Sequence, residues 1–373
     1  MDFTISQDAL LGALTLANAV ADRRAVGQPI LGNVLLRASK DNTLTIVATD
    51  LTISVSLVMP VEVRRPGALT IGAKYLHQVV RTLPGGKPLA VTALENMWAR
   101  IGVGRSEFKL MGQSPSDYPE VPTLPKGMAV AEVKADTIAD LIEKTGFSVS
   151  ADEARVNLSG VLLACDGKRA TMVSTDGHRL TKLSLDMDGA PTFAHPIIIP
   201  RKGMLEIKRA LDRIDGKIGI AVDGGVLYLR TADMVLSVKL SNVVFPPYEQ
   251  VIPEQHDRLA VCDRAELLSV LTRAEVMAPE KTATVRLSIT PGAVATMTIT
   301  ADNPDLGVAS QVIDIEFTGD AIVAGFNAHY MIEVLSAMES ERVRLEFQGE
   351  LDPCVLRPVD GDDYLGVVMP MRI

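Results

Sequence analysis

The sequence predicts an α+β fold of three tandem similar domains, each with two helices and two groups of antiparallel strands. One observation is an apolar strand pattern that ends in Asp50, Asp176 and Asp302, with 126 residues between successive copies. The others are an amphipathic helix pattern before each copy and a second one after it. A repeat this long indicates tandem domains and not a solenoid. The expected domains are residues 1–125, 126–253 and 254–373.

The first helix of each domain is indicated by apolar residues spaced three and four apart, which lie on one helix face. These sets are Leu10, Leu11 and Leu14; Ile138, Leu141 and Ile142; and Leu267, Leu268 and Leu271. We expect Asp136 and Asp263 to be N-caps, because a short acidic side chain accepts hydrogen bonds from the first helical amides. Glu266, three residues after Asp263, matches the capping-box pattern.

A β-hairpin is predicted after each first helix. The hairpins cover residues 33–50, 159–176 and 285–302, with turns at Asp41-Asn42, Asp166-Gly167 and Pro291-Gly292. The repeated aspartates are therefore expected at strand ends or turns, and in three separate domains they cannot share one metal ion. A second helix is expected at residues 74–83, 201–211 and 328–338, and the Pro-rich segments 117–127 and 245–255 are expected linkers.

Three similar domains placed head to tail turn the chain through an arc, so we expect a half-ring. If the two ends of the arc are complementary, this kind of heterologous contact between copies closes into a ring. The tandem repeat therefore predicts an oligomer as well as a fold.

The composition predicts a globular cytoplasmic protein. Of 373 residues, 47% are apolar and 22% are charged, and no apolar run is long enough to suggest a membrane span. The start, MDFTISQDALL, lacks the basic residues of a signal peptide, and the three distant cysteines fit a reducing compartment. A net charge of -9 argues against ordinary nucleic-acid binding, although a local basic surface can occur on an acidic protein.

Basic residues are concentrated in the second helix of the central domain. That helix carries Arg201, Lys202, Lys208, Arg209 and Arg213, whereas residues 327–338 of the third domain carry neither Lys nor Arg. A solvated charged face is the simplest interpretation. No aromatic residues alternate with these cations as in proteins that stack bases, so any contact with nucleic acid is expected to be with phosphates.

His178 beside Asp176 is the obvious catalytic candidate, since a His–Asp pair can act as a general base. No serine or cysteine nucleophile motif accompanies it, and the chain contains no GxxxxGK[ST] phosphate loop. Asp186 and Asp188 lack the downstream ligands of a calcium loop. We therefore expect no enzyme, metal or cofactor, and His178 has either a structural role or a role in binding.

Five strings in chain order resemble one known family. They are Pro29–Asn33 (PILGN), Thr175–Leu180 (TDGHRL), Pro200–Gly203 (PRKG), Phe245-Pro246 with Tyr248, and Val367–Arg372 (VVMPMR). Together with the three repeats, they make the chain similar to the beta subunit of bacterial DNA polymerase III, the beta sliding clamp.

The resemblance implies a DNA polymerase processivity factor without catalytic activity: a head-to-tail homodimer whose ring encircles duplex DNA and slides on it without sequence preference. It also implies that the protein binds the DNA polymerase III catalytic subunit and the clamp loader. Other polymerases and repair factors that carry clamp-binding peptides are further implied partners. The alternative is a repeat-built protein-interaction scaffold with no DNA partner, which gives no reason for the basic helix at 201–213.

The resemblance also implies three sets of site residues. The peptide groove, between the second and third domains, contains Arg155, Leu158, Thr175, Gly177, His178, Arg179, Leu180, Pro246, Gln250, Val251, Asn327, Tyr330, Val367, Val368, Met369, Pro370, Met371 and Arg372. The DNA-contacting set is Arg23, Arg24, Lys74, Arg201, Lys202, Lys208 and Arg209. The dimer interface pairs Arg105, Phe108 and Leu110 with Val276 and Met277. The apolar end VVMPMRI is expected to form a last strand, to line a pocket, or both.

Some positions depart from the family pattern. Gln250 stands where an Arg is frequent, and Val156 and Asn157 stand where an aromatic pair occurs, so peptide or DNA contacts can differ. An acidic run often follows Asn303-Pro304, but here Asp305 is followed by Leu306-Gly307-Val308. The family's ion pairs across the dimer interface are therefore not predicted for this chain.

Overall fold

The computed structural model describes residues 1–22, 27–152, 154–361 and 363–373. In these residues every predicted helix is present, in the predicted order. The helices are α1 (Gln7–Val20), α2 (Ala73–Thr82), α3 (Ala135–Thr145), α4 (Arg201–Leu211), α5 (Arg264–Glu275) and α6 (Ala328–Ser336). Short 3-10 helices are η1 (Pro29–Gly32), η2 (Glu95–Met97), η3 (Pro115–Asp117), η4 (Gly146–Ser148) and η5 (Tyr248–Val251). None of the described helices is both long and apolar enough to span a membrane.

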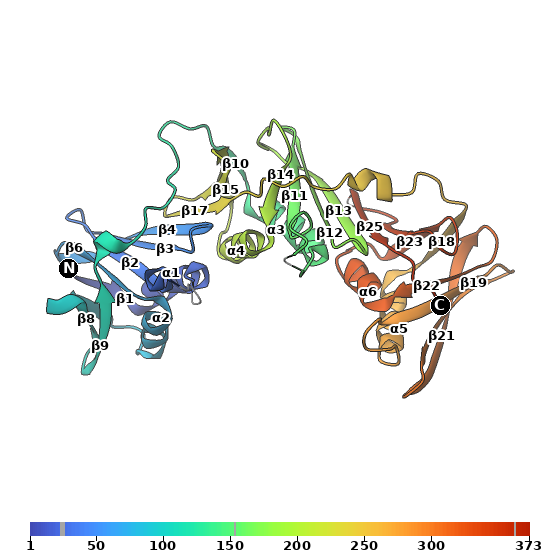
Figure 1. Ribbon diagram of the computed structural model, residues 1–373, viewed down its shortest axis with the longest axis horizontal. Coiled ribbons are helices and arrows are strands. Elements are labelled where there is room, and N and C mark those ends of the chain that lie inside the picture. The colour runs from blue at the N-terminus through green and yellow to red at the C-terminus, as the bar shows by residue number, and fades with distance from the viewer. Residues whose placement is uncertain (23–26, 153, 362) are drawn as a thin grey trace. The chain divides into compact units, whose positions relative to one another are not determined.

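The described strands form two antiparallel sheets (Figure 1). The first contains, in spatial order, β10 (Ala131–Lys134), β15 (Lys217–Asp223), β16 (Val226–Arg230), β17 (Met234–Lys239), β4 (Ile53–Pro60), β3 (Thr43–Thr49), β2 (Asn33–Ala38), β6 (Gly67–Gly72), β9 (Ser106–Gln113), β8 (Trp98–Val103), β7 (Pro88–Ala93), β1 (Asp2–Ser6) and β5 (Glu62–Arg65). The second contains β14 (Ile197–Pro200), β11 (Gly160–Cys165), β12 (Arg169–Thr175), β13 (Arg179–Asp186), β25 (Asp363–Val368), β24 (Cys354–Pro358), β23 (Arg342–Phe347), β18 (Arg258–Asp263), β21 (Gly307–Thr318), β20 (Ala295–Asn303), β19 (Thr284–Thr290) and β22 (Ile322–Asn327).

The chain divides into two compact units, each with one of these sheets. One comprises residues 1–135 and 205–240, and the other comprises residues 136–204 and 241–373. In the first unit β17 pairs with β4, and in the second β13 pairs with β25. Each unit thus draws strands from two expected domains, and the boundaries placed at 125 and 253 stay predictions.

The three predicted hairpins are confirmed as β2–β3, β11–β12 and β19–β20. After β3, Asp50 Oδ1 accepts the backbone N–H groups of Thr52 and Ile53 at 2.8 and 2.6 Å. After β12, Asp176 Oδ1 accepts those of His178 and Arg179 at 2.9 and 3.0 Å. The predicted turn role is therefore confirmed for these two aspartates.

Asp302 lies at a strand end as predicted, but it does not make the turn. Strand β20 continues one residue further, through Asn303, before the chain turns into β21. The turn is made one residue later, where Asn303 Oδ1 accepts the N–H of Asp305 at 3.0 Å. Asn suits this position because its short side chain can accept a hydrogen bond from the backbone two residues on.

The two predicted N-caps have different outcomes. Asp263 caps α5 as predicted, accepting the N–H of Glu266 at 2.7 Å. Asp136 is not a cap, because α3 already begins at Ala135 and places Asp136 in its first turn. There its negative charge still interacts favourably with the positive end of the helix dipole.

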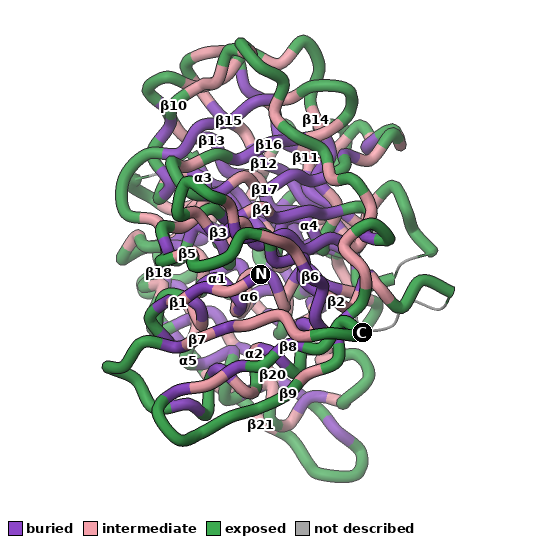
Figure 2. The backbone as a smooth tube through the Cα atoms, turned by 90° about the vertical axis from the view of Figure 1, so that its left-hand side faces the viewer, coloured by how far each residue is buried: buried purple, intermediate pink, exposed green. Residues whose placement is uncertain are grey.

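The core lies where the helices cover the sheets. Helix α1 packs against α2, β3 and β4, and α5 packs against α6, β20 and β21 (Figure 1). Leu10, Leu14, Leu267 and Leu271 on their buried faces have no exposed surface. Buried segments follow the strands, and exposed ones follow the loops (Figure 2).

Candidate peptide-binding site around the β13–β25 pair

The β13–β25 pair brings two of the predicted strings together. Arg179 lies opposite Val368 and Leu180 lies opposite Val367 in this antiparallel ladder. Just beyond it, the carbonyl of His178 accepts the backbone N–H of Met369 at 2.9 Å. The turn of the second predicted domain and the C-terminal segment of the third therefore form one surface.

The C-terminal segment lies along the edge of β22. The N–H of Met371 donates to the carbonyl of Gly325 at 2.8 Å, and Ile373 occupies the space where a side chain on residue 325 would lie. A pocket of about 360 Å³ is present beside this contact, and Met371, Arg372 and Leu351 are among its lining residues. Both expectations for the apolar end are thus confirmed: β25 is the last strand, and the residues after it line a pocket.

Leu351 was not predicted as a site residue. It lies between β23 and β24 with 69% of its surface exposed, next to Glu350 in the same pocket. No local motif marks these two residues, because it is the sheet pairing that places them beside the C-terminal segment. A leucine between two acidic residues was the only signal in the sequence.

An apolar cluster forms the base of the site. Leu180 and Val367 are 2% and 1% exposed and pack with Phe245, and Tyr248 and Ile252 cover the cluster. The residues flanking these anchors remain accessible: Val251 is 44% exposed. On the C-terminal segment Met369 is 37% exposed. Accessible apolar groups beside a fixed apolar base can accept hydrophobic side chains of a ligand.

Gly177 is required by the turn between β12 and β13. Its φ of 88° lies in the left-handed region, which favours glycine. Arg155 Nη1 and Leu158 Cδ1 lie 3.5 and 3.8 Å from where its Cβ would be. The Thr175 hydroxyl donates to the carbonyl of Arg179 at 2.6 Å and accepts the N–H of Gly177 at 3.1 Å. These contacts fix the turn and leave His178 exposed on it.

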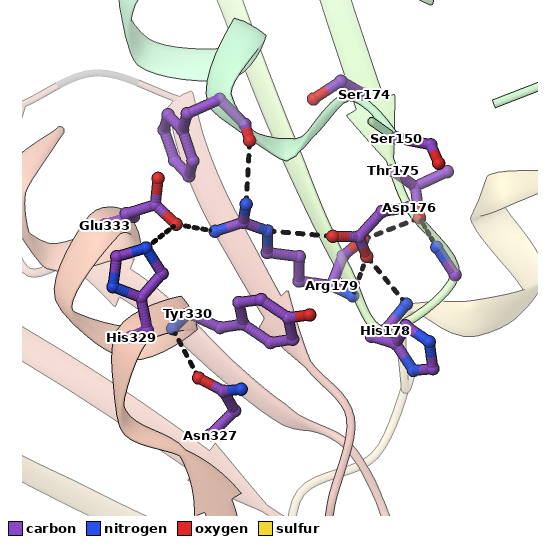
Figure 3. A network of polar contacts seen from close by, with 12 residues as sticks. Ser150, Ser174, Thr175, Asp176, His178, Arg179, Asn327, His329, Tyr330 and Glu333 are labelled. Atoms are coloured by element: carbon purple, nitrogen blue, oxygen red, sulfur yellow. Dashed lines mark hydrogen bonds and ion pairs between the residues drawn. The ribbon is translucent and has the colours of Figure 1, made fainter. Parts of the chain in front are cut away.

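Arg179 points into the protein, where its guanidinium is surrounded by partners (Figure 3). Its Nε donates to Asp176 Oδ2 at 3.2 Å, Nη2 donates to the carbonyl of Phe147 at 2.8 Å, and Nη1 pairs with Glu333. The guanidinium carbon lies 4.4 Å from the centre of the Tyr330 ring. With 8% of its surface exposed, Arg179 holds the turn against α6 and has little surface to offer a ligand.

Asn327 and Tyr330 belong to the start of α6. Asn327 Oδ1 caps the helix by accepting the N–H of Tyr330 at 3.1 Å, and its Nδ2 donates to the carbonyl of Thr282 at 2.9 Å. Burial raises the pKa of the Tyr330 hydroxyl, and the Asp176 carboxylate adds to this effect. Tyr330 is therefore a neutral ring available to stack on Arg179.

Replacing Arg179 with Ala should lower the free energy of unfolding by about 3 kcal/mol, because it removes the cation that pairs with the half-buried Asp176 and Glu333 carboxylates and the donor to the Phe147 carbonyl. Urea denaturation would measure the change. Arg155→Ala is the matched control: that side chain is 49% exposed in its ion pair with Asp152, so its loss should cost under about 1 kcal/mol. Equal destabilisation by both variants would contradict the structural role of Arg179.

The Asp176 carboxylate is not arranged to activate His178. Oδ1 accepts two backbone amides, one of them from His178 itself, and Oδ2 accepts Arg179 Nε. In a catalytic pair, the carboxylate would instead orient the imidazole ring. The geometry therefore favours a turn-forming role for Asp176 over a part in a catalytic His–Asp pair.

The predicted DNA-contacting residues have different surroundings. Lys74, Arg201 and Lys202 are exposed on α2 and α4, whereas Arg23 and Arg24 lie outside the described residues. Lys208 lies 3.2 Å from Asp212, and Arg209 donates to Glu206 at 2.5 and 2.7 Å. Part of the positive charge of this helix is thus balanced by its own acidic residues.

Of the predicted interface residues, Phe108 and Leu110 lie on β9, Arg105 directly precedes it, and Val276 and Met277 follow α5. Within the described chain, residues 106–111 of β9 pair only with β8, since β6 joins β9 only at Gly112 and Gln113. Among the residues that the structure describes, 307–315 of β21 pair only with β20. Phe108 on β9 is 39% exposed, and Val276 after α5 is 72% exposed.

Comparison with known proteins matches the whole length of the chain. Models of the N-terminal, central and C-terminal domains of the DNA polymerase III beta subunit match residues 1–122, 132–247 and 249–372. The beta sliding clamps of Pseudomonas aeruginosa and Escherichia coli K12 are 33% and 32% identical to the chain, over the full length of both proteins in each comparison. The chain belongs to the beta sliding clamp family.

The solved structures agree with the clamp assignment. The Pseudomonas aeruginosa clamp bound to griselimycin has a TM-score of 0.92 with 32% identity, and each chain is covered completely. The predicted three-domain α+β clamp fold is therefore confirmed. As a beta clamp, the protein is a DNA polymerase processivity factor.

Proposed function

We propose that two copies of this clamp close head to tail into a ring around duplex DNA, and that polymerases are tethered to it through the site around β13–β25. The observation that carries the proposal is the joining of the 175–180 turn to the C-terminal segment through the His178–Met369 hydrogen bond. Three separate sequence strings meet there on an apolar base that includes Phe245. The ring itself makes no catalytic contribution.

Ring closure is proposed through the open edges of β9 and β21. An unpaired strand edge carries backbone donors and acceptors that a strand of a second copy can satisfy. Exposed apolar side chains accompany both edges: Phe108 and Met111 on β9, and Val308 and Val312 on β21. A contact between these edges joins unlike surfaces of two copies, as a head-to-tail ring requires.

DNA is proposed to be held by enclosure, with weak contacts from Lys74, Arg201 and Lys202. The protein carries a net charge of -9, and Lys208 and Arg209 already have acidic neighbours in their own helix. These few cations cannot give tight binding through phosphate neutralisation alone. Contacts that are weak and independent of sequence permit sliding.

The site around β13–β25 is proposed to bind a short, mostly hydrophobic peptide. Accessible Val251 and Met369 would receive its apolar side chains, and exposed His178 and Arg155 would make polar contacts that fix its register. The proteins expected to carry such peptides are the DNA polymerase III catalytic subunit, the clamp loader, and other polymerases and repair factors. A related clamp binds griselimycin, which shows that a protein of this fold can take a ligand.

Deleting residues 369–373 should abolish binding of the clamp-binding peptide of the polymerase III catalytic subunit. The deletion removes Met369 and Met371 from the site, together with the hydrogen bond to His178. Isothermal calorimetry would measure the affinity, and light scattering would show whether the truncated protein remains dimeric. Undiminished affinity in a dimeric truncated protein would place the peptide site elsewhere.

A further inference from the structure

The segment between β17 and β18, residues 240–257, forms one wall of the proposed peptide site because it carries Pro246, Gln250 and Val251. It is fixed at its start, where the N–H of Ser241 donates to the carbonyl of Ile198 at 2.9 Å. In its middle, Phe245, Tyr248 and Ile252 pack on the apolar cluster.

The later part of this segment lacks such support from the backbone. Residues 253–257 precede β18, and within the described chain none of their amides donates a backbone hydrogen bond. Pro253 has no amide hydrogen, and Glu254 and Gln255 are exposed. Side-chain contacts must therefore hold this part of the wall.

His256 supplies such a contact. Its Nε2 lies 2.8 Å from Glu346 Oε2, and the two side chains are 16% and 4% exposed. An N–H at Nε2 donates to the carboxylate whether the imidazole is neutral or protonated. This links the segment to β23, 90 residues further along the chain.

The Glu346 side chain is itself held in place by two further ion pairs. Its carboxylate also pairs with Arg344 Nε at 2.8 Å and with Arg357 Nε at 3.2 Å, from β23 and the adjacent β24. These ion pairs fix the position of the buried carboxylate. In the β23–β24 ladder Glu346 lies opposite Val355, which belongs to the same apolar cluster as Leu180 and Val367.

We propose that His256 is a positioning residue of the peptide site. Its hydrogen bond to Glu346 holds residues 248–257 against the sheet that forms the base of the site, so that Val251 and Gln250 are in place before a peptide arrives. This proposal rests on the proposed function of the β13–β25 site. Without this hydrogen bond, residues 248–257 occupy the binding position in only a fraction of the molecules. The association rate then falls to that fraction of the wild-type rate.

The test measures association and dissociation rates of the fluorescein-labelled clamp-binding peptide of the polymerase III catalytic subunit, using the full-length protein. His256→Ala should slow association about tenfold and leave dissociation nearly unchanged. His256→Gln should restore the wild-type rate, because its amide nitrogen can occupy the place of Nε2. His256→Asn, whose shorter side chain places its amide nearer the backbone, should behave like the Ala variant.

His195→Ala is the matched control, since His195 is exposed in the same compact unit and lies before β14. Unchanged rates in His256→Ala would overturn the proposal, as would equal slowing in His195→Ala. Faster dissociation would show that His256 contacts the peptide directly, which also overturns it. If the Ala variant fails to fold, the association rates of the Gln and Asn variants test the proposal. Equal rates in these two variants would overturn it. A wild-type protein that does not bind the peptide would instead refute the proposed site, whatever the variants do.

Discussion

A single cut in a circular DNA should release this protein within seconds to minutes, although a wash with about 0.5 M salt, several times physiological ionic strength, leaves it on the intact circle. A protein held by phosphate contacts loses affinity steeply as salt rises, because salt opposes the release of counterions. A closed ring leaves only by opening or by sliding off an end. The protein would be loaded on nicked circular DNA by its clamp loader, and the bound fraction measured by gel filtration.

The matched variant replaces Arg201 and Lys202, both exposed at the start of α4, with Ala. Enclosure predicts that this variant loads less efficiently but, once loaded, is retained on circles like the wild type. Equal retention on circular and linear DNA, or loss from intact circles at high salt, would refute the ring. Such a result would also favour the alternative of an interaction scaffold.

Val276→Asp should convert the dimer into a monomer. Val276 is 72% exposed beyond the end of α5, and dimer formation would bury the new charge without a partner, at a cost of several kcal/mol. Met277→Asp tests the same interface less cleanly. Met277 is half-buried, and its Cε lies 3.6 Å from the Cβ position of Gly307, so the substitution would also disturb the fold of its own chain.

Light scattering across a dilution series would measure the dimer. Val294→Asp is the control, because Val294 is also largely exposed, at 65%, but lies in the β19–β20 turn, outside the predicted interface. The control should remain dimeric. A Val276→Asp dimer with an unchanged dissociation constant would place the contact between copies elsewhere on the surface.

Structural features that depend on residues close together in the sequence were predicted well. Helix faces, hairpin turns and the Asp263 cap depend on residues a few positions apart, and the structure confirms them. The differences from prediction are local shifts: Asp136 lies inside a helix that begins one residue earlier, and Asn303 makes the turn one residue after Asp302. Such shifts are difficult to predict because neighbouring polar residues can serve equally well.

The polar interior of the site could not be predicted. Arg179 and Glu333 are 154 residues apart, and His256 and Glu346 are 90 apart, so no spacing rule connects them. The family resemblance placed Arg179 in the groove but could not show that its donors are used within the protein. The pairs Lys208–Asp212 and Glu206–Arg209, by contrast, lie at helical spacings that the sequence shows, although they were not predicted.

The sheets that cross the expected domain boundaries have a consequence for how this chain can be divided. A gene fragment that stops in the linker at 117–127 would encode β4 without β17, leaving residues 53–57 of β4 without a neighbour on that side. A fragment that begins at β18 would likewise leave β25 without β13. Bare edges of this kind favour aggregation during expression. The Pro-rich linkers are therefore poor places to truncate the protein for recombinant production.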